Sequence, residues 1–448
     1  MGACAWRDRI LGIDDRMPLL DGRLAPYIHL DNAASTPPLA EVAEAVQRFL
    51  PYYSSVHRGT GFKSRVSTGL YDEARDVIAR FVSADPEDNT VIFGKNTTEA
   101  INKLAHRYPF RPRDVVLSTA LEHHSNDLPW RGRAELVRAR LTPDGRLDED
   151  DFDGLLKTYG ERVALVTVSG ASNVTVFVQP IHRLARKAHQ MGARILVDAA
   201  QLAPHRRIDV KPNRDPEHLD FVALSAHKMY APFGTGALIG CRDVFSQGAP
   251  EYAGGGTVEI VTPTSVRWAE LPDREEAGTP NVVGAVALAA AAGAFMESDR
   301  TALENHEGEL TLYALERLRA LSRVTVYGDD GGDRVGVIAF NVEDVPHALV
   351  AAILGYEGGI AVRSGCFCAQ GYVTHLLGLG AAEQERWQRD HHLGDRTRRP
   401  GMVRISLGAH NTRDDVDAAL DMLDRVIRGA YSGRYGQVQD TGEYLPAG

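Results

Sequence analysis

The chain has 448 residues, and acidic side chains outnumber basic ones to give a formal net charge of −10. With 44% hydrophobic and 25% charged residues, the composition is that of a folded globular protein and excludes global disorder. The length favours two domains. The acidic balance gives no sign of the clustered basic surface that nucleic acids or anionic membranes would require as partners.

Neither the apolar runs nor the cysteines point to a membrane or secreted protein. The longest apolar run, Val282–Met296, is too short to span a bilayer and predicts a buried helix. The N-terminus lacks a basic segment followed by an unbroken apolar stretch, so no secretory signal is predicted. The few cysteines do not form a disulfide scaffold, which makes a reduced cytoplasm the expected location. They are Cys4, Cys241, Cys366 and Cys368.

The first clear structural unit is a strand, a helix and a second strand. Val163–Ser169 and Ile195–Asp198 are short β-branched runs, and Pro180–Met191 between them repeats apolar residues at helical spacing. Pro180 near the start and Gly192 just past the end are typical helix boundaries. A strand–helix–strand unit of this length predicts a parallel pair inside a buried sheet.

Other strand-like runs extend this unit into one mostly parallel α/β domain over residues 31–298, preceded by an N-terminal segment over residues 1–30. The expected further strands are Thr90–Phe93, Val115–Thr119, Leu136–Arg140, Phe221–Leu224 and Ala237–Gly240.

A smaller α/β domain is predicted over residues 299–432. Helices are expected at His347–Leu354 and at Asp414–Arg428, and Thr412 with Asp415 resembles a capping box for the second of these. Residues 433–448 form a polar tail that we expect to be loosely ordered, and Arg386–Arg399 is expected to be a solvated loop. The expected strands are Val324–Tyr327, Val335–Asn341, Ile360–Arg363 and Val403–Ser406.

Two residues at predicted strand ends suggest where the chemistry lies. Asp198 ends one strand, and Lys228 follows the end of another. In a parallel sheet both would face the crevice at the carboxyl edge, where ligands bind. A lysine there can lose its proton and form a Schiff base, while a carboxylate can keep a pyridine nitrogen protonated. Alone, either residue is more simply read as a turn cap or a surface lysine.

The same edge contains groups that suit a phosphate. Gly94–Glu99 follows a strand and opens a helix predicted at Glu99–His106, and free N–H groups at a helix start can bind an anion. Glu122–Asn126 follows another strand and places a histidine pair near the crevice. A metal site is not predicted, because no spaced ligand pair accompanies these histidines.

Eight segments together resemble the class V aminotransferase family and, within it, the cysteine desulfurases of the SufS and NifS type. They occur in family order over nearly the whole chain. These segments are Leu30-Asp31-Asn32-Ala33-Ala34-Ser35, Thr97-Thr98-Glu99-Ala100-Ile101-Asn102, Glu122-His123-His124-Ser125-Asn126, Asp198-Ala199-Ala200-Gln201, Ser225-Ala226-His227-Lys228, Glu276-Ala277-Gly278-Thr279-Pro280-Asn281, Arg363-Ser364-Gly365-Cys366-Phe367-Cys368-Ala369 and Arg404-Ile405-Ser406-Leu407.

The resemblance implies a fold-type-I homodimer that binds pyridoxal 5'-phosphate, with a large mostly parallel-sheet domain and a smaller C-terminal α/β domain. It implies that Lys228 attaches the cofactor, that Asp198 and Gln201 contact its ring nitrogen and hydroxyl, and that His123 stacks on the ring and moves protons. The residues that it implies for the phosphate are Thr98, Ser225, His227 and, from the partner subunit, Thr279. Those that it implies for the amino-acid substrate are Asn173, Arg404, Arg363 and Ala33.

Cys368 determines the reaction that the resemblance implies. In the desulfurases a loop cysteine takes sulfur from the substrate as a persulfide while alanine is released, which requires a mobile thiolate. A protein sulfur acceptor is then an expected partner. Otherwise Cys368 is a small buried hydrophobe, as many free cysteines are. For Cys366, packing is favoured over a role in resolving the persulfide.

Three alternatives remain beside the desulfurase. Another class V pyridoxal-phosphate enzyme (a selenocysteine lyase, C–S lyase, epimerase or carbon–carbon bond-forming enzyme) could act on a different amino acid or sulfur metabolite, because fold does not determine function. A non-catalytic binding protein is disfavoured, since Lys228, Asp198, Gln201 and His123 are all present. A nucleotide-binding dehydrogenase is poorly supported, because no G-x-G-x-x-G loop joins a strand to a helix.

Overall fold

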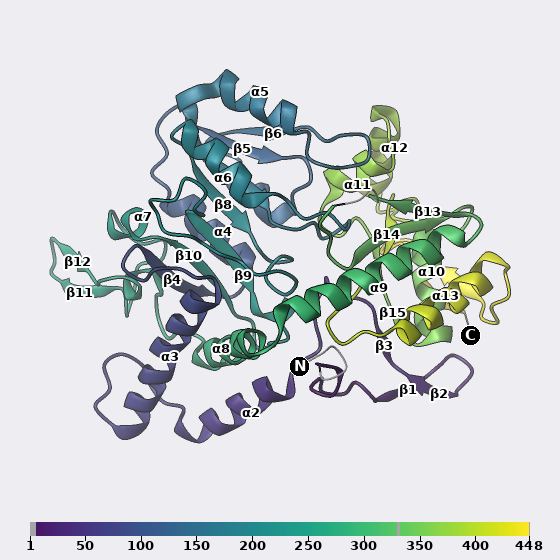
Figure 1. The fold of residues 1–448 in the computed structure, drawn as a ribbon, viewed down its shortest axis with the longest axis horizontal. Helices are drawn as coiled ribbons and strands as arrows, with labels where there is room; N and C mark the ends of the chain where they lie inside the picture. Colours follow the sequence, from purple (N-terminus) through teal and green to yellow (C-terminus); the bar gives the residue numbers. More distant parts are fainter. Residues whose placement is uncertain (1–5, 329–331, 448) are drawn as a thin grey trace.

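The computed structural model describes residues 6–328 and 332–447, so Cys4 lies outside the described residues. Its largest sheet has seven strands in the order β4-β10-β9-β8-β7-β5-β6 (Figure 1). Six of these strands run in the same direction and β10 alone runs opposite to them, so the predicted mostly parallel sheet is confirmed. The strands are β4 (Asn89–Gly94), β5 (Val115–Thr119), β6 (Glu135–Ala139), β7 (Val163–Ser169), β8 (Arg194–Asp198), β9 (Phe221–Ser225) and β10 (Gly236–Cys241).

Helices cover both faces of this sheet (Figure 1). In β5, Val115 and Leu117 belong to one hydrophobic cluster while Val116 between them belongs to another, so both faces are buried. The helix α4 packs on the face of Val116, and α8 on the other face. The helices of this part are α2 (Ala40–Phe49), α3 (Phe62–Phe81), α4 (Thr97–Arg107), α5 (Glu149–Tyr159), α6 (Ile181–Gln190), α7 (Arg242–Ser246) and α8 (Val282–Glu297).

A second, four-stranded antiparallel sheet has the order β13-β14-β17-β16. The long helix α9 leads from the large sheet to this smaller one (Figure 1). The strands are β13 (Val324–Tyr327), β14 (Val337–Val342), β16 (Arg363–Gly365) and β17 (Met402–Ser406). The helices are α9 (Arg300–Ala320), α10 (His347–Gly358), α11 (Gln370–Leu376), α12 (Ala381–His392) and α13 (Arg413–Ile427).

Four short strand pairs complete the fold. They are β1 (Arg16–Pro18) with β2 (Leu24–Pro26), β3 (Ile28–His29) with β15 (Ile360–Ala361), β11 (Val258–Val261) with β12 (Val266–Trp268), and β18 (Tyr435–Gln437) with β19 (Tyr444–Pro446). The parallel pairing of β3 with β15 joins the N-terminal segment to the small sheet. The predicted domain boundaries after residues 30, 298 and 432 stay a prediction.

Several local expectations are confirmed and three are wrong. Thr412 and Asp415 form the predicted capping box of α13. The expected strand Ile360–Arg363 is split, because its two ends pair with different sheets as β15 and β16. The stretch Arg386–Arg399, expected to be a loop, is helical up to His392, where α12 ends.

The polar tail is also more ordered than expected. The strands β18 and β19 form a hairpin, and the hydroxyl of Tyr435 donates a hydrogen bond to the carboxylate of Glu357 at 3.1 Å. Backbone N–H groups of Ser432 and Gly433 donate to the same carboxylate at 2.9 and 2.8 Å. Composition alone missed this segment because its order depends on one carboxylate far away in the sequence.

Among the described residues, no single helix has the length and hydrophobicity to cross a membrane. The pair α8 and α9 passes such a test only when joined, and the two are bent by 87°.

A histidine pair on one aspartate predicts a pH effect on stability. The rings of His189 and His218 stack with centroids 4.1 Å apart, and both Nε2 atoms face the Asp220 carboxylate, at 2.9 and 3.4 Å. The contact with Asp220 raises the pKa of His218. A pKa raised by folding stabilises the protein below the unfolded value of about 6.5, and this contribution is lost as pH rises through the folded value.

We therefore expect His218→Gln to lower the free energy of unfolding at pH 5.5, by about 1 kcal/mol or less because the ring is partly exposed. The difference from wild type should shrink towards pH 8.5. Urea unfolding at several pH values measures it, with His182→Gln on α6 as the control. A difference that does not change with pH would contradict the assignment.

Candidate active site

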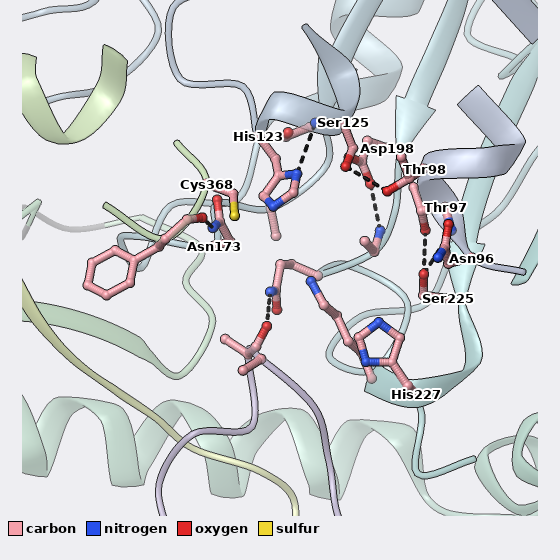
Figure 2. A pocket seen from close by; sticks show the side chains of 18 of the residues that line it. Asn96, Thr97, Thr98, His123, Ser125, Asn173, Asp198, Ser225, His227 and Cys368 are labelled. Carbon is pink, nitrogen blue, oxygen red and sulfur yellow. Dashed lines mark hydrogen bonds between the residues drawn. The ribbon is translucent and has the colours of Figure 1, made fainter. Parts of the chain in front are cut away.

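A cavity of about 340 Å³ lies at the carboxyl edge of the large sheet (Figure 2). Its walls come from the segments that follow β4, β5, β7, β8 and β9, from the loop after β3, and from β16, β17 and the loop after β16. Parallel strands bring their carboxyl ends to one edge, so segments far apart in sequence converge there.

Twelve of the predicted site residues line this one cavity. They are Ala33, Thr98, His123, Asn173, Asp198, Gln201, Ser225, His227, Lys228, Arg363, Cys368 and Arg404. Thr279 is exposed and does not line the cavity of this chain. Its expected contribution from a partner subunit stays a prediction.

The Lys228 amine loses its proton more easily than that of an ordinary lysine. It ends the short 3₁₀ helix Ala226–Lys228 that directly follows β9, and the side chain is partly buried in the cavity wall. Removal from water, with the nearby Arg404, lowers the pKa of Lys228 to about 8, although Asp198 opposes the shift. Among the described residues its ammonium group has no hydrogen-bond partner. A lysine with this pKa supplies an unprotonated amine close to neutral pH.

Asp198 and Gln201 are buried polar groups with unused bonding capacity. One Asp198 oxygen accepts the N–H of Ala200 at 3.0 Å, and burial raises the pKa of the carboxyl group. The Gln201 amide donates to the carbonyl of Ala33 at 2.7 Å, which leaves its buried oxygen without a partner. Buried polar groups are normally satisfied, so both side chains indicate a polar ligand in the cavity.

His123 is held as a neutral ring. The backbone N–H of Ser125 donates to His123 Nδ1 at 3.1 Å, so the ring proton of the neutral form lies on Nε2. Burial and the charge of Lys228 lower the pKa of His123 to about 3. The ring can therefore lie against a bound group and donate from Nε2 without carrying a charge.

The opposite end of the cavity is rich in hydroxyl groups (Figure 2). Ser225 Oγ accepts the N–H of Thr97 at 2.8 Å at the start of α4, and Thr98 Oγ1 lies 2.7 Å from Ser125 Oγ. The Asn96 side chain caps the helix by accepting the N–H of Glu99. Sequence reasoning named Thr98 and Ser225 individually. The residues Asn96, Thr97 and Ser125, which also line the cavity, lay only within the predicted segments Gly94–Glu99 and Glu122–Asn126. Their position at a helix start next to a strand end was the available signal.

Two arginines line the small-sheet side of the cavity, and both pair with one aspartate behind it. Arg363 and Arg404 are paired residues of β16 and β17, and each forms an ion pair with one oxygen of Asp31 at 2.9 Å. Arg404 is buried, and it also donates to the carbonyl of Asn173 at 2.9 Å while its Nε has no partner. This buried Nε is a free donor for an incoming carboxylate. The sequence contained Asp31 within a quoted motif, but its role with the arginines required the structure.

The two cysteines of the loop after β16 have different surroundings. Cys368 is exposed and lines the cavity, so the reading of Cys368 as a small buried hydrophobe is wrong. Cys366 is buried, with Sγ 3.1 Å from the carbonyl of Pro400, and burial raises the pKa of its thiol. Cys368 is thus the accessible thiol of the pair, and Cys366 packs as expected.

Val176 lies three residues after Asn173 of the cavity wall. Its φ is not positive, and its side chain is buried in the small-sheet hydrophobic cluster. The backbone here does not need the freedom of glycine.

Comparisons with known proteins agree with this geometry. A family model described as aminotransferase class-V matches residues 28–419. A probable cysteine desulfurase of Halalkalibacterium halodurans is 35% identical over 419 residues, covering 91% of this chain and 95% of the relative. The cysteine desulfurase of Haloferax volcanii is 33% identical over 413 residues, covering 90% of each chain.

A solved structure shows the same architecture. The apo cysteine desulfurase of Thermococcus onnurineus NA1 matches with a TM-score of 0.80 and 31% identity, covering 94% of this chain and 99% of the other. The expected fold, a large mostly parallel α/β sheet with a smaller C-terminal part, is therefore confirmed. Taken together, the motifs in family order, the shared cavity and these matches show that the chain belongs to the aminotransferase class-V family.

Proposed function

We propose that this chain is a pyridoxal-phosphate-dependent cysteine desulfurase, which converts L-cysteine to L-alanine and takes the sulfur as a persulfide on Cys368. The observation that carries the proposal is one cavity lined by Lys228, Asp198, His123 and Arg404 together with the exposed thiol of Cys368. The names of the relatives and of the structural neighbour support the same activity.

The residues present fit the cofactor. Lys228 offers an amine without a hydrogen-bond partner among the described residues, and Asp198 offers a buried carboxylate for a protonated ring nitrogen. Gln201 has a buried oxygen without a partner, and because its amide nitrogen already donates to the carbonyl of Ala33, this oxygen is available as an acceptor. Thr98, Ser225 and His227, with the start of α4, would hold the phosphate. When bound, pyridoxal phosphate supplies an aldehyde that combines with amines and a ring that withdraws electrons.

Each cavity residue then has a defined task. Arg404 binds the substrate carboxylate and so orients the amino acid. Lys228, as a free amine, removes the proton from the substrate Cα and can return a proton afterwards. Asp198 keeps a proton on the ring nitrogen, and His123 holds one at Nε2 beside the reacting atoms.

Sulfur transfer is a substitution at the substrate sulfur. Cys368 Sγ, as a thiolate, forms an S–S bond with this sulfur while the Cβ–S bond breaks. The bonding electron pair stays on Cβ, which takes up a proton and becomes the methyl group of alanine. The overall change is cysteine plus the Cys368 thiol to alanine plus the Cys368 persulfide, so atoms and electrons balance.

The test is sulfide release from L-cysteine by purified, yellow protein with added thiol reductant. Equal amounts of alanine and sulfide are expected. Intact cofactor without sulfide would overturn the desulfurase proposal and favour another class V enzyme with a different amino acid or sulfur metabolite as substrate.

Arg404→Lys tests substrate binding. Lysine keeps the charge but lacks the Nε donor that Arg404 leaves free for the substrate, so the KM for cysteine should rise roughly 10- to 100-fold, the cost of a hydrogen bond to a charged group. Arg363→Lys is the matched comparison and should have a smaller effect, because the Arg363 side chain is 52% exposed against 3% for Arg404. Steady-state kinetics on cofactor-saturated protein measures both. Equal effects would contradict a leading role for Arg404.

Three further expectations accompany the function. We propose that the enzyme acts as a homodimer in the cytoplasm, with Thr279 contributing to the partner's phosphate site. A protein sulfur acceptor would collect sulfur from Cys368, whose exposure supports such a transfer.

A further inference from the structure

The loop that contains Cys368 has an unusual backbone. Phe367 and Cys368 both have positive φ values, 52° and 54°, in the left-handed region. Residues with a side chain rarely adopt this conformation, and two in succession need support from their surroundings. The conformation determines where the Cys368 thiol points.

Three hydrogen bonds from outside the loop support it. The Asn173 amide donates to the carbonyl of Phe367 at 2.6 Å, as Figure 2 shows. The backbone N–H of His124 donates to the carbonyl of Cys368 at 2.7 Å. The N–H of Gln370 donates to the imidazole Nε2 of His124 at 3.3 Å. His124 therefore holds the chain at the carbonyl of Cys368 and two residues further on, at Gln370, while Asn173 holds it at the preceding residue.

His124 does this from outside the cofactor cavity. The side chains of His123 and Ser125 line that cavity, whereas Glu122 and His124 line a separate cavity of about 480 Å³ together with Gln370. His124 does not line the cavity in which the substrate would bind, so its influence on the reaction has to pass through the Cys368 loop.

The contact with Gln370 requires a neutral imidazole. Burial lowers the pKa of His124, the positive charges of Arg131 and Arg399 lower it further, and Asp127 opposes the shift. The neutral ring with its proton on Nδ1 can accept a hydrogen bond at Nε2, whereas the protonated ring can only donate. Acidification should therefore break the contact with Gln370.

We propose that His124 is a positioning residue for Cys368: its backbone N–H and its imidazole Nε2 together hold the loop in the left-handed conformation from which the thiol reaches the substrate sulfur. The inference rests on the proposed desulfurase function for its catalytic consequence. The contact itself can be tested without any turnover.

Two variants separate the side-chain contact from general damage to the site. His124→Gln places an amide oxygen near the former Nε2 and keeps an acceptor that does not titrate, whereas His124→Leu removes the acceptor at similar size. The cofactor absorbance and melting temperature of both variants show whether each is folded. His391→Leu, at an exposed histidine of α12, is the matched control.

The first readout is hydrogen exchange of the segment around Gln370 in the holoenzyme, followed by mass spectrometry. We expect this amide to exchange roughly 3- to 10-fold faster in His124→Leu, the value of one hydrogen bond, and at the wild-type rate in His124→Gln and His391→Leu. Unchanged exchange in His124→Leu would overturn the proposal, whether or not the protein releases sulfide.

The second readout is the single-turnover rate of persulfide formation on Cys368 from pH 4.5 to 8.5, a range that extends well below the usual histidine value of about 6.5 because the pKa of His124 is lowered. At neutral pH the rate in His124→Leu should be roughly 3- to 10-fold lower than in wild type. The rate in His124→Gln should equal that of wild type. As pH falls, the persulfide-formation rate of His124→Leu divided by that of wild type should approach one, because protonation of His124 removes the contact in wild type as well. A ratio that stays constant with pH would overturn the role of the imidazole.

The two readouts distinguish the failures. Faster exchange in His124→Leu with no persulfide in wild type would reject the proposed function but keep the contact. Persulfide formation in wild type with no change in either readout for His124→Leu would reject the inference and keep the function.

Discussion

Replacing Cys368 with serine is expected to lower sulfide release from L-cysteine by about 1000-fold or more, as loss of a catalytic nucleophile does in other enzymes. Cys368 is exposed at the cavity and is the thiol placed to take the sulfur. A serine hydroxyl is a far weaker nucleophile at neutral pH and cannot store sulfur as a persulfide. The cofactor should stay bound, because its proposed contacts come from Lys228, Asp198 and the other residues of the large sheet. Sulfide and alanine assays measure the loss, and visible absorbance checks the cofactor.

Cys366→Ser is the matched control for this prediction. Cys366 lies two residues away, but its Sγ contacts the carbonyl of Pro400, a contact that a serine hydroxyl can replace. Most of the activity should therefore remain in this variant. Full activity in Cys368→Ser would reject the persulfide role, while equal losses in both variants would indicate damage to the loop.

Replacing Lys228 with alanine is expected to lower activity by about 10²- to 10⁴-fold, the usual contribution of a general acid–base group. The variant should also lose covalent attachment of the cofactor. Borohydride reduction followed by mass spectrometry should show the added mass on Lys228 in wild type and no added mass in the variant. Lys157→Ala, at an exposed position of α5, should behave as wild type.

The pKa of Lys228 gives this prediction a pH dependence. With a pKa of about 8, the fraction of Lys228 that is neutral increases about tenfold per pH unit at pH values below 8. At higher pH this fraction levels off. Attachment of added cofactor to apoprotein should follow the same curve. Attachment that is already maximal at pH 6, or absence of any effect in Lys228→Ala, would contradict the assignment.

The order of elements along the chain could be predicted because it depends on local patterns. The strand Val163–Ser169 is observed with the same ends as β7, and the helix expected over Pro180–Met191 is α6 over Ile181–Gln190. A β-branched run and an apolar repeat at helical spacing are properties of neighbouring residues, so they can be read from a single sequence. The split of Ile360–Arg363 into β15 and β16 could not be predicted from the sequence, since each half pairs with a distant strand.

The residues of the cavity show the same division. The motifs of the sequence determined the fold class and which side chains could bind a cofactor, and twelve of these side chains lie in one cavity. Only the tertiary structure showed that Asp31 pairs with both arginines and that His124 holds the loop of Cys368. The pair Asp31 and Arg404 is 373 residues apart, and His124 and Gln370 are 246 apart. Hydrogen bonds and ion pairs act over a few ångströms in space, so contacts of this kind are decided by the packing of the two sheets and leave no local pattern in the sequence.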